Sequence, residues 1–249
     1  MHRLVVLWAT PRTTSTAFEW MMRMRGDMAC FHEPFGEAWY KGEDALWPRI
    51  GPDSPRVSGL SRMAVLERLA KTAESRPVFS KDMPHYIDDL VDDAFLGLFT
   101  HSFLIRDPAK SIPSIAKRGP DWVEKEYGFA EHRWMFDRVT EWLGHPPPVI
   151  DSDDLLEDPA GIVAAWCRAV DIPFIAEALS WEPGARPELG WYDDGSWHDT
   201  LGQSDGLKPQ PRRYGSVEGA SAEVQDRYAR ALPHYEHLYR HRLQAETVA

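Results

Sequence analysis

Hydroxyl-bearing and basic side chains gather in one short stretch near the start of the chain, Thr10-Pro11-Arg12-Thr13-Thr14-Ser15-Thr16. The stretch follows an apolar run at 4–9, which is typical of a strand buried on both faces of a sheet. It precedes apolar residues at helical spacing over 18–22. Backbone N–H groups at a helix N-terminus attract anions, and Arg12 would add positive charge. The stretch therefore predicts a phosphate-binding loop between a strand and a helix.

Capping of the following helix by Thr13 or Ser15 is the structural alternative for this cluster. The position of the cluster favours ligand binding, because open α/β sheets bind ligands at the carboxyl ends of their strands. The loop lacks the Gly-x-x-x-x-Gly-Lys-Ser/Thr pattern that wraps a β,γ-phosphate pair. A nucleotide that presents a single 5′ phosphate is therefore favoured over ATP.

A second candidate anion site follows the strand-like run at 101–105. Arg106 would stand at the end of that strand, and Ser114 would lie one to two turns into the next helix. A guanidinium fork and a hydroxyl can converge on one phosphate. A strand-end ion pair between Arg106 and Asp107 is the alternative.

The order of predicted elements indicates an α/β fold with a mostly parallel sheet. At 249 residues the chain is expected to form one domain over 1–249, with long loop insertions near 35–62 and 182–219. The predicted strands are 4–9 (the central one), 28–32, 78–80, 101–105 and 148–151, and the predicted helices, besides the one after the loop, are 61–74, 108–117, 129–143, 159–170 and 222–242.

Composition narrows the classes of partner. The formal net charge of −11 would repel a polyanion from most of the surface, so no nucleic-acid partner is expected. No apolar run has the length of a membrane span, and no membrane partner is expected. The only two cysteines, Cys30 and Cys167, are expected to be buried reduced thiols, which indicates a cytoplasmic protein. The sequence predicts no oligomeric state.

Three stretches together resemble the sulfotransferases that use 3′-phosphoadenosine 5′-phosphosulfate (PAPS). The loop at 10–16 is similar to their 5′-phosphosulfate loop, and Arg106 with Ser114 resembles their 3′-phosphate pair. The segment 149–159 resembles their strand, acidic turn and following helix. The resemblance implies a P-loop NTPase-like three-layer α/β/α fold, PAPS as co-substrate, no metal, and a small-molecule acceptor.

A bacterial and plant sulfotransferase-like group, some members of which are labelled branched-chain aminotransferase-like, is more similar still. The matching stretches are 11–16, 32–35, 80–85 and 100–113. The chain shows no sequence context for a pyridoxal phosphate lysine, so the aminotransferase label finds no support. The resemblance predicts sulfuryl transfer to a hydroxyl or amine of a small metabolite.

In-line sulfuryl transfer passes through a loose anionic transition state, so positioning and charge stabilisation are expected to supply most of the rate. Arg12 and Lys81 are predicted to stabilise the departing phosphate. Three residues compete as general base. The resemblance places a carboxylate base at Glu33, which we favour, with His85 next and Asp82 as an orienting partner.

A histidine base comes two residues after the equivalent lysine in many cytosolic sulfotransferases, whereas this chain has Met83 there. That departure weakens the case for a histidine base. Arg212 and Arg213 are a further candidate for closing over the nucleotide 3′ phosphate, or else form a solvated basic turn. The aromatic residues of the late loop either line an acceptor pocket or fill the core; they are Trp181, Trp191, Tyr192 and Trp197.

Two other functions remain open from the sequence. The acidic segment 151–154 could help to hold Mg²⁺ in a P-loop-type small-molecule kinase that uses ATP. The same loops could also belong to a nucleotide-binding protein without catalysis, in which no base is positioned.

Overall fold

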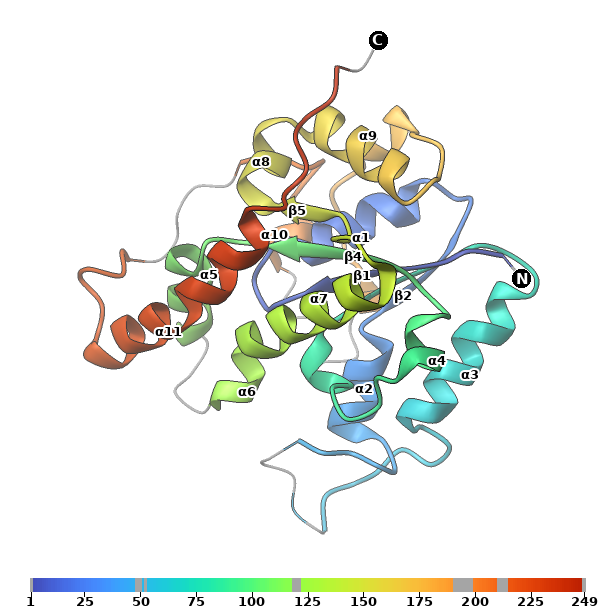
Figure 1. Cartoon of the computed structure of the whole chain (residues 1–249), viewed down its shortest axis with the longest axis horizontal. Helices are drawn as coiled ribbons and strands as arrows, with labels where there is room; N and C mark the ends of the chain where they lie inside the picture. Colours follow the sequence, from blue (N-terminus) through green and yellow to red (C-terminus); the bar gives the residue numbers. More distant parts are fainter. Residues whose placement is uncertain are drawn as a thin grey trace.

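The computed structural model describes residues 2–47, 51, 53–117, 122–189, 199–209 and 215–247, with only the backbone described at 199 and 200. Its centre is a five-stranded sheet in the order β2-β3-β1-β4-β5, in which every pairing is parallel (Figure 1). The strands are β1 (Leu4–Ala9), β2 (Ala29–His32), β3 (Val78–Asp82), β4 (Thr100–Ile105) and β5 (Val149–Asp151).

Helices cover both faces of the sheet, which gives three layers (Figure 1). They are α1 (Ser15–Met24), α2 (Pro34–Lys41), α3 (Arg62–Ala73), α4 (Asp93–Leu96), α5 (Pro108–Ala116), α6 (Glu124–Tyr127), α7 (Phe129–Leu143), α8 (Ser152–Glu157), α9 (Pro159–Ala169), α10 (Asp199–Gly202) and α11 (Ala222–Tyr239). Three short 3₁₀ helices, η1 (Pro84–Tyr86), η2 (Ala176–Leu179) and η3 (Pro187–Leu189), complete the described elements.

Alternate residues of β1 supply the two halves of the core, because successive side chains of a strand point to opposite faces. Leu4, Val6 and Trp8 pack in a cluster with α2, α3 and α7. Val5, Leu7 and Ala9 pack in the other cluster with α1 and α9. All six residues of β1 are buried, as its continuous apolar run predicts for the central strand of a parallel sheet.

The predicted α/β fold with its parallel sheet is confirmed, and all five predicted strands are present. The prediction of a loop from residue 35 onward is wrong at its start, since α2 occupies 34–41. The indole of Trp39 is buried in the core, and packing of this kind stabilises a helix that the interior glycine, Gly36, disfavours. No described helix is long and apolar enough to cross a membrane.

Candidate active site

The loop after β1 has an unusual backbone conformation. Among the described residues, four non-glycine residues have a positive φ, and three of them are predicted site residues: Arg12 (65°), Thr14 (72°) and Glu33 (42°). A left-handed conformation is costly for a side-chain-bearing residue, and such strain is concentrated at functional sites. The strained residues follow β1 and β2, so they stand at the carboxyl edge of the sheet.

The hydroxyls of the loop do not cap α1. Thr13 donates its hydroxyl to the carbonyl of Thr10 at 2.7 Å, which closes the turn, and Thr14 exchanges a 2.7 Å hydrogen bond with Ser152 of α8. Thr14, the N-cap residue of α1, makes no side-chain capping hydrogen bond. The N–H of Ala17 donates to the carbonyl of Thr14 at 3.0 Å, and we expect the N–H groups of Ser15 and Thr16 to meet water or a ligand. The structure therefore does not bear out the capping alternative, and phosphate binding by the loop stays a prediction.

The members of the loop differ in exposure. Pro11, Thr13 and Ser15 are buried, whereas Arg12 and Thr16 are partly exposed. Pro11 has no N–H to donate, so we expect it to shape the turn rather than bind a ligand. Arg12 and the N–H groups at the start of α1 are therefore the groups of the loop that we expect to bind an anion.

The two predicted anion sites meet at Arg12. The guanidinium of Arg106 donates from Nη1 to the carbonyl of Arg12 at 2.8 Å, and Nε of Arg12 donates to Oγ of Ser114 at 3.1 Å. Asp107 instead caps α5 by accepting from the N–H of Ala109 at 2.8 Å. The structure thus brings together the residues expected to hold a 5′ and a 3′ phosphate.

Lys81 and Glu33 form a buried ion pair beside the loop. The side chain of Lys81 is 0% exposed and that of Glu33 is 12% exposed, so the carboxylate alone reaches solvent. Glu33 also accepts a 3.3 Å hydrogen bond from the hydroxyl of Tyr86. The N–H of Glu33 donates to the carbonyl of Lys81 at 2.8 Å, which fixes the two backbones side by side.

Asp82 faces away from the ion pair, because it follows Lys81 in β3. Its carboxylate accepts from the N–H groups of Phe35 at 3.0 Å and Met83 at 3.2 Å. Burial raises the pKa of Asp82 well above its usual value, although these two hydrogen bonds act in the opposite direction. The carboxylate thus holds the start of α2, next to Glu33. The predicted role of Asp82, to orient Lys81 or His85, stays a prediction.

His85 is buried in η1 under the N-terminus of α7, with only 1% of the residue exposed. Burial lowers the pKa of its imidazole to about 3, so His85 is neutral at neutral pH and a weak base. Among the described residues its Nδ1 has no hydrogen-bond partner. Of the competing bases, Glu33 is therefore the better placed.

Gly128 packs directly on His85. We therefore expect a larger side chain at this position to destabilise the protein. Gly128 has a φ of +68°, and a Cβ there would lie 2.7 Å from Nδ1 of His85. Gly128→Ala combines the left-handed penalty, about 1–2 kcal/mol, with overpacking, about 1–3 kcal/mol, and should lower the free energy of unfolding by their sum. Urea denaturation measures the loss.

Gly144 at the other end of α7 provides the matched control, since its φ is +75° and a Cβ would meet nothing within 4 Å. Gly144→Ala should lose only the backbone part, about 1–2 kcal/mol. Equal losses in the two variants would show that the contact with His85 carries no energy.

The carboxylates of the acidic segment after β5 form hydrogen bonds and ion pairs with other residues of the protein. Asp151 caps α8 by accepting from the N–H of Asp153 at 2.8 Å, and it accepts from the hydroxyl of Tyr235 at 3.0 Å. Lys110 pairs with Asp153 at 2.6 Å, and Arg242 pairs with Asp154 at 3.0 Å. These contacts disfavour the use of the segment as a magnesium site.

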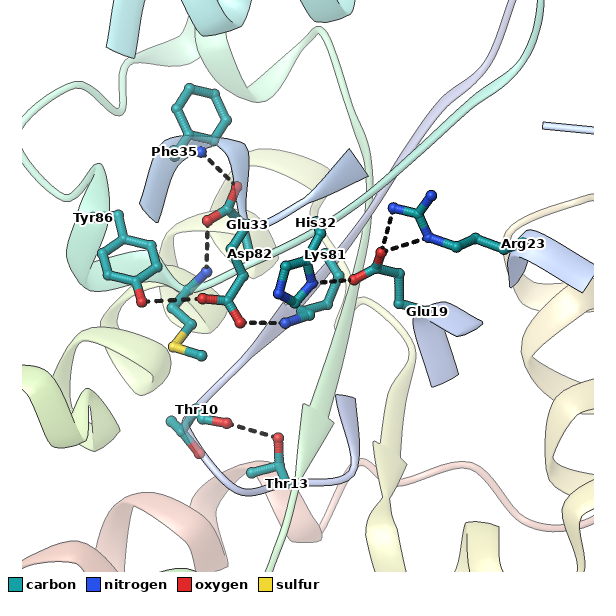
Figure 2. A network of polar contacts seen from close by, with 11 residues as sticks. Thr10, Thr13, Glu19, Arg23, His32, Glu33, Phe35, Lys81, Asp82 and Tyr86 are labelled. Carbon is teal, nitrogen blue, oxygen red and sulfur yellow. Dashed lines mark hydrogen bonds and ion pairs between the residues drawn. The ribbon is translucent and has the colours of Figure 1, made fainter. Parts of the chain in front are cut away.

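The sequence did not lead us to expect Tyr86, Glu19 or His32 in the network of polar contacts around the Lys81–Glu33 ion pair (Figure 2). Glu19 of α1 is fully buried and accepts from Nδ1 of His32 at 2.6 Å. It also accepts from Nε and Nη2 of Arg23 at 3.0 and 2.8 Å. Only His32 had a sequence signal, its place beside Glu33 in a matching stretch; Glu19 looked like an ordinary surface helix residue.

Arg212, Arg213, Trp191, Tyr192 and Trp197 lie outside the described residues. Trp181 is 7% exposed and belongs to the core cluster around α1 and α9. It donates from Nε1 to Oγ of Ser204 at 3.2 Å. For Trp181 the core interpretation is therefore correct.

A five-stranded parallel sheet with helices on both faces gives the chain a three-layer α/β/α fold of the P-loop-like class. Within that class the chain belongs to the Sulfotransferase domain family, which matches residues 3–241. Two solved structures share the fold. The Sulfotransferase Domain from the Curacin Biosynthetic Pathway is 12% identical with a TM-score of 0.54, over 92% of this chain and 97% of that one.

The Sulfotransferase Domain from the Synechococcus PCC 7002 Olefin Synthase is 16% identical with a TM-score of 0.53, over 92% of this chain and 94% of that one. Curated relatives come from Arabidopsis thaliana. Branched-chain-amino-acid aminotransferase-like protein 2 is 30% identical over 83% of this chain, and protein 1 is 27% identical over 94%. The matches span only 36% and 41% of those two proteins.

Proposed function

We propose that this chain transfers a sulfuryl group from PAPS to a hydroxyl or amine of a small metabolite. The observation that carries the proposal is the contact between the two anion sites through Arg12, at 2.8 Å to Arg106 and 3.1 Å to Ser114. One adenosine bisphosphate can therefore reach both sites. Membership of the Sulfotransferase domain family supports sulfuryl transfer as the chemistry.

Each part of the site has a role in this proposal. The first-turn N–H groups of α1 and Arg12 bind the 5′ phosphate, and Arg106 with Ser114 binds the 3′ phosphate. Lys81 is 0% exposed, so in this proposal it acts through its charge from behind Glu33 and stabilises the negative charge that develops on the oxygen bridging phosphorus and sulfur. Glu33 pairs with Lys81 and is 12% exposed, and its exposed part supports its assignment to the acceptor side of the site.

The transfer step balances on these residues. The acceptor oxygen or nitrogen forms a bond to sulfur as the bond between sulfur and the bridging oxygen breaks. The electron pair of the broken bond stays on the phosphate of the product, adenosine 3′,5′-bisphosphate (PAP). The acceptor proton passes to the carboxylate of Glu33, which Lys81 and Tyr86 hold in place.

Calorimetry with PAP tests the proposal. Saturable binding is expected, and Arg106→Gln should weaken it by about 10–100-fold, because a hydrogen-bonded charge pair contributes about 1.5–3 kcal/mol. Arg138→Gln is the control, since Arg138 forms surface pairs with Asp93 and Glu141 away from the loop. An absence of PAP binding in the unaltered protein, with thermal stabilisation by ATP and Mg²⁺ instead, would favour the kinase.

A further inference from the structure

Lys81 lies between two carboxylates, of which the proposed mechanism uses only one. Glu33 pairs with its ammonium on one side. On the other side is Glu19, close enough that the charge of Lys81 helps to lower the pKa of Glu19. Figure 2 shows the ammonium between Glu33 and the Glu19–His32 pair. The side chain of Lys81 is 0% exposed, so its charge is balanced by the Glu33 contact and by the nearby charge of Glu19 rather than by water.

The carboxylates of Glu33 and Glu19 have different roles in the proposed reaction. Glu33 receives the acceptor proton in the proposed reaction and becomes neutral at that moment. A buried ammonium without a negative neighbour loses its proton readily, because desolvation disfavours the charged form. A lysine paired with Glu33 alone would therefore tend to lose its proton, and with it its positive charge, in the step that needs that charge.

Glu19 is held in its charged form by the residues around it. Burial alone would raise its pKa, but the attraction and hydrogen bond of His32, together with Lys81 and Arg23, lower the pKa to about 2. His32 stands beside Lys81 in the sheet register, on the neighbouring strand. Glu19 lies one turn into α1, the helix that begins at the phosphate loop. The Glu19–His32 pair thus connects α1, which begins at the loop 10–16, with the Lys81–Glu33 ion pair.

Among the residues that the structure describes, the other charged groups near Lys81 do not offer an equivalent counter-charge. Asp82 is adjacent in β3 but points to the other face of the sheet, and burial raises its pKa well above the usual value. Arg23 is positive and is itself bound to Glu19. Glu19 is therefore the carboxylate near Lys81 whose charge persists.

We propose that Glu19, oriented by His32 and Arg23, is a permanent counter-charge that keeps Lys81 protonated while Glu33 gains and loses its proton. Glu19 touches no reacting atom in this scheme and is a positioning residue. Its value for catalysis rests on the proposed sulfuryl transfer. Its effect on Lys81 is a property of the protein without any substrate.

The test is an NMR titration of Lys81 in ligand-free protein labelled with ¹³C-lysine, with the Cε signal assigned by its loss in Lys81→Met. Glu19→Gln should lower the pKa of Lys81 by about one unit or more, a tenfold change in its protonation equilibrium. Arg23→Gln removes a positive neighbour from the same carboxylate, and it should leave that pKa unchanged or raise it. Melting curves confirm that each variant is folded.

Glu33→Gln supplies an independent arm should Glu19→Gln not fold. Lys81 is expected to remain protonated through about pH 8 in that variant, because Glu19 still balances its charge. Deprotonation below about pH 8 there, or a Lys81 pKa that Glu19→Gln does not lower, would overturn the proposal. Since no PAPS is present, failure of the sulfotransferase function would appear separately, as missing PAP binding.

Discussion

Glu33→Gln is expected to reduce sulfuryl transfer by about 10²–10⁴-fold, the range in which a positioned general base contributes. The amide keeps the size of the side chain and can still accept from Tyr86, but it cannot take a proton from the acceptor. The site residues proposed for PAP are untouched, so affinity for PAP should be retained. Release of PAP from PAPS, measured with a panel of hydroxylated and amino metabolites, gives the rate, and calorimetry gives the affinity.

Glu37→Gln is the matched control, because Glu37 lies one turn further along α2 and is partly exposed. It should transfer at the rate of the unaltered protein. Normal turnover in Glu33→Gln would remove Glu33 as the base and return the role to His85 or Asp82. Loss of turnover with PAP affinity retained would exclude a nucleotide-binding protein without catalysis.

Lys81→Met should reduce the rate of transfer by about 10²–10³-fold, comparable to removing one preorganised donor from a site where charge develops. Methionine preserves most of the length of the buried stem and removes only the charge. The loss should fall mainly on kcat, because the charge on the bridging oxygen grows in the transition state. Single-turnover rates at saturating PAPS, together with KM for PAPS, separate an effect on the transfer step from an effect on PAPS binding.

The same substitution leaves Glu33 and Glu19 without their shared cation, so a loss of stability is expected as well. Breaking a buried ion pair costs about 3–5 kcal/mol. Rates are therefore compared at a temperature where melting curves show the variant folded. Lys71→Met, at an exposed position of α3, is the control for an altered net charge. A rise in KM with unchanged kcat would assign Lys81 to ground-state binding instead.

The strand pattern and the places of the candidate anion sites could be predicted from local sequence. The apolar run at 4–9 determined a strand buried on both faces, and the hydroxyl-rich stretch after it leads into a helix as expected, while its binding of phosphate stays a prediction. Arg106 and Ser114 were found in the same way, as a strand-end cation and a hydroxyl in the next helix. Such signals are local, because strand and helix periodicity need only a few neighbouring residues.

Which side chains meet was decided only by the tertiary structure. The pairing of Lys81 with Glu33 depends on the register of β2 against β3, and Glu19 joins them because α1 packs over that face. Our preference for Glu33 among the competing bases depends on burial, because His85 is buried and Glu33 is partly exposed. Burial and contact between residues far apart in sequence are set by packing of the whole domain, and no window of sequence contains them.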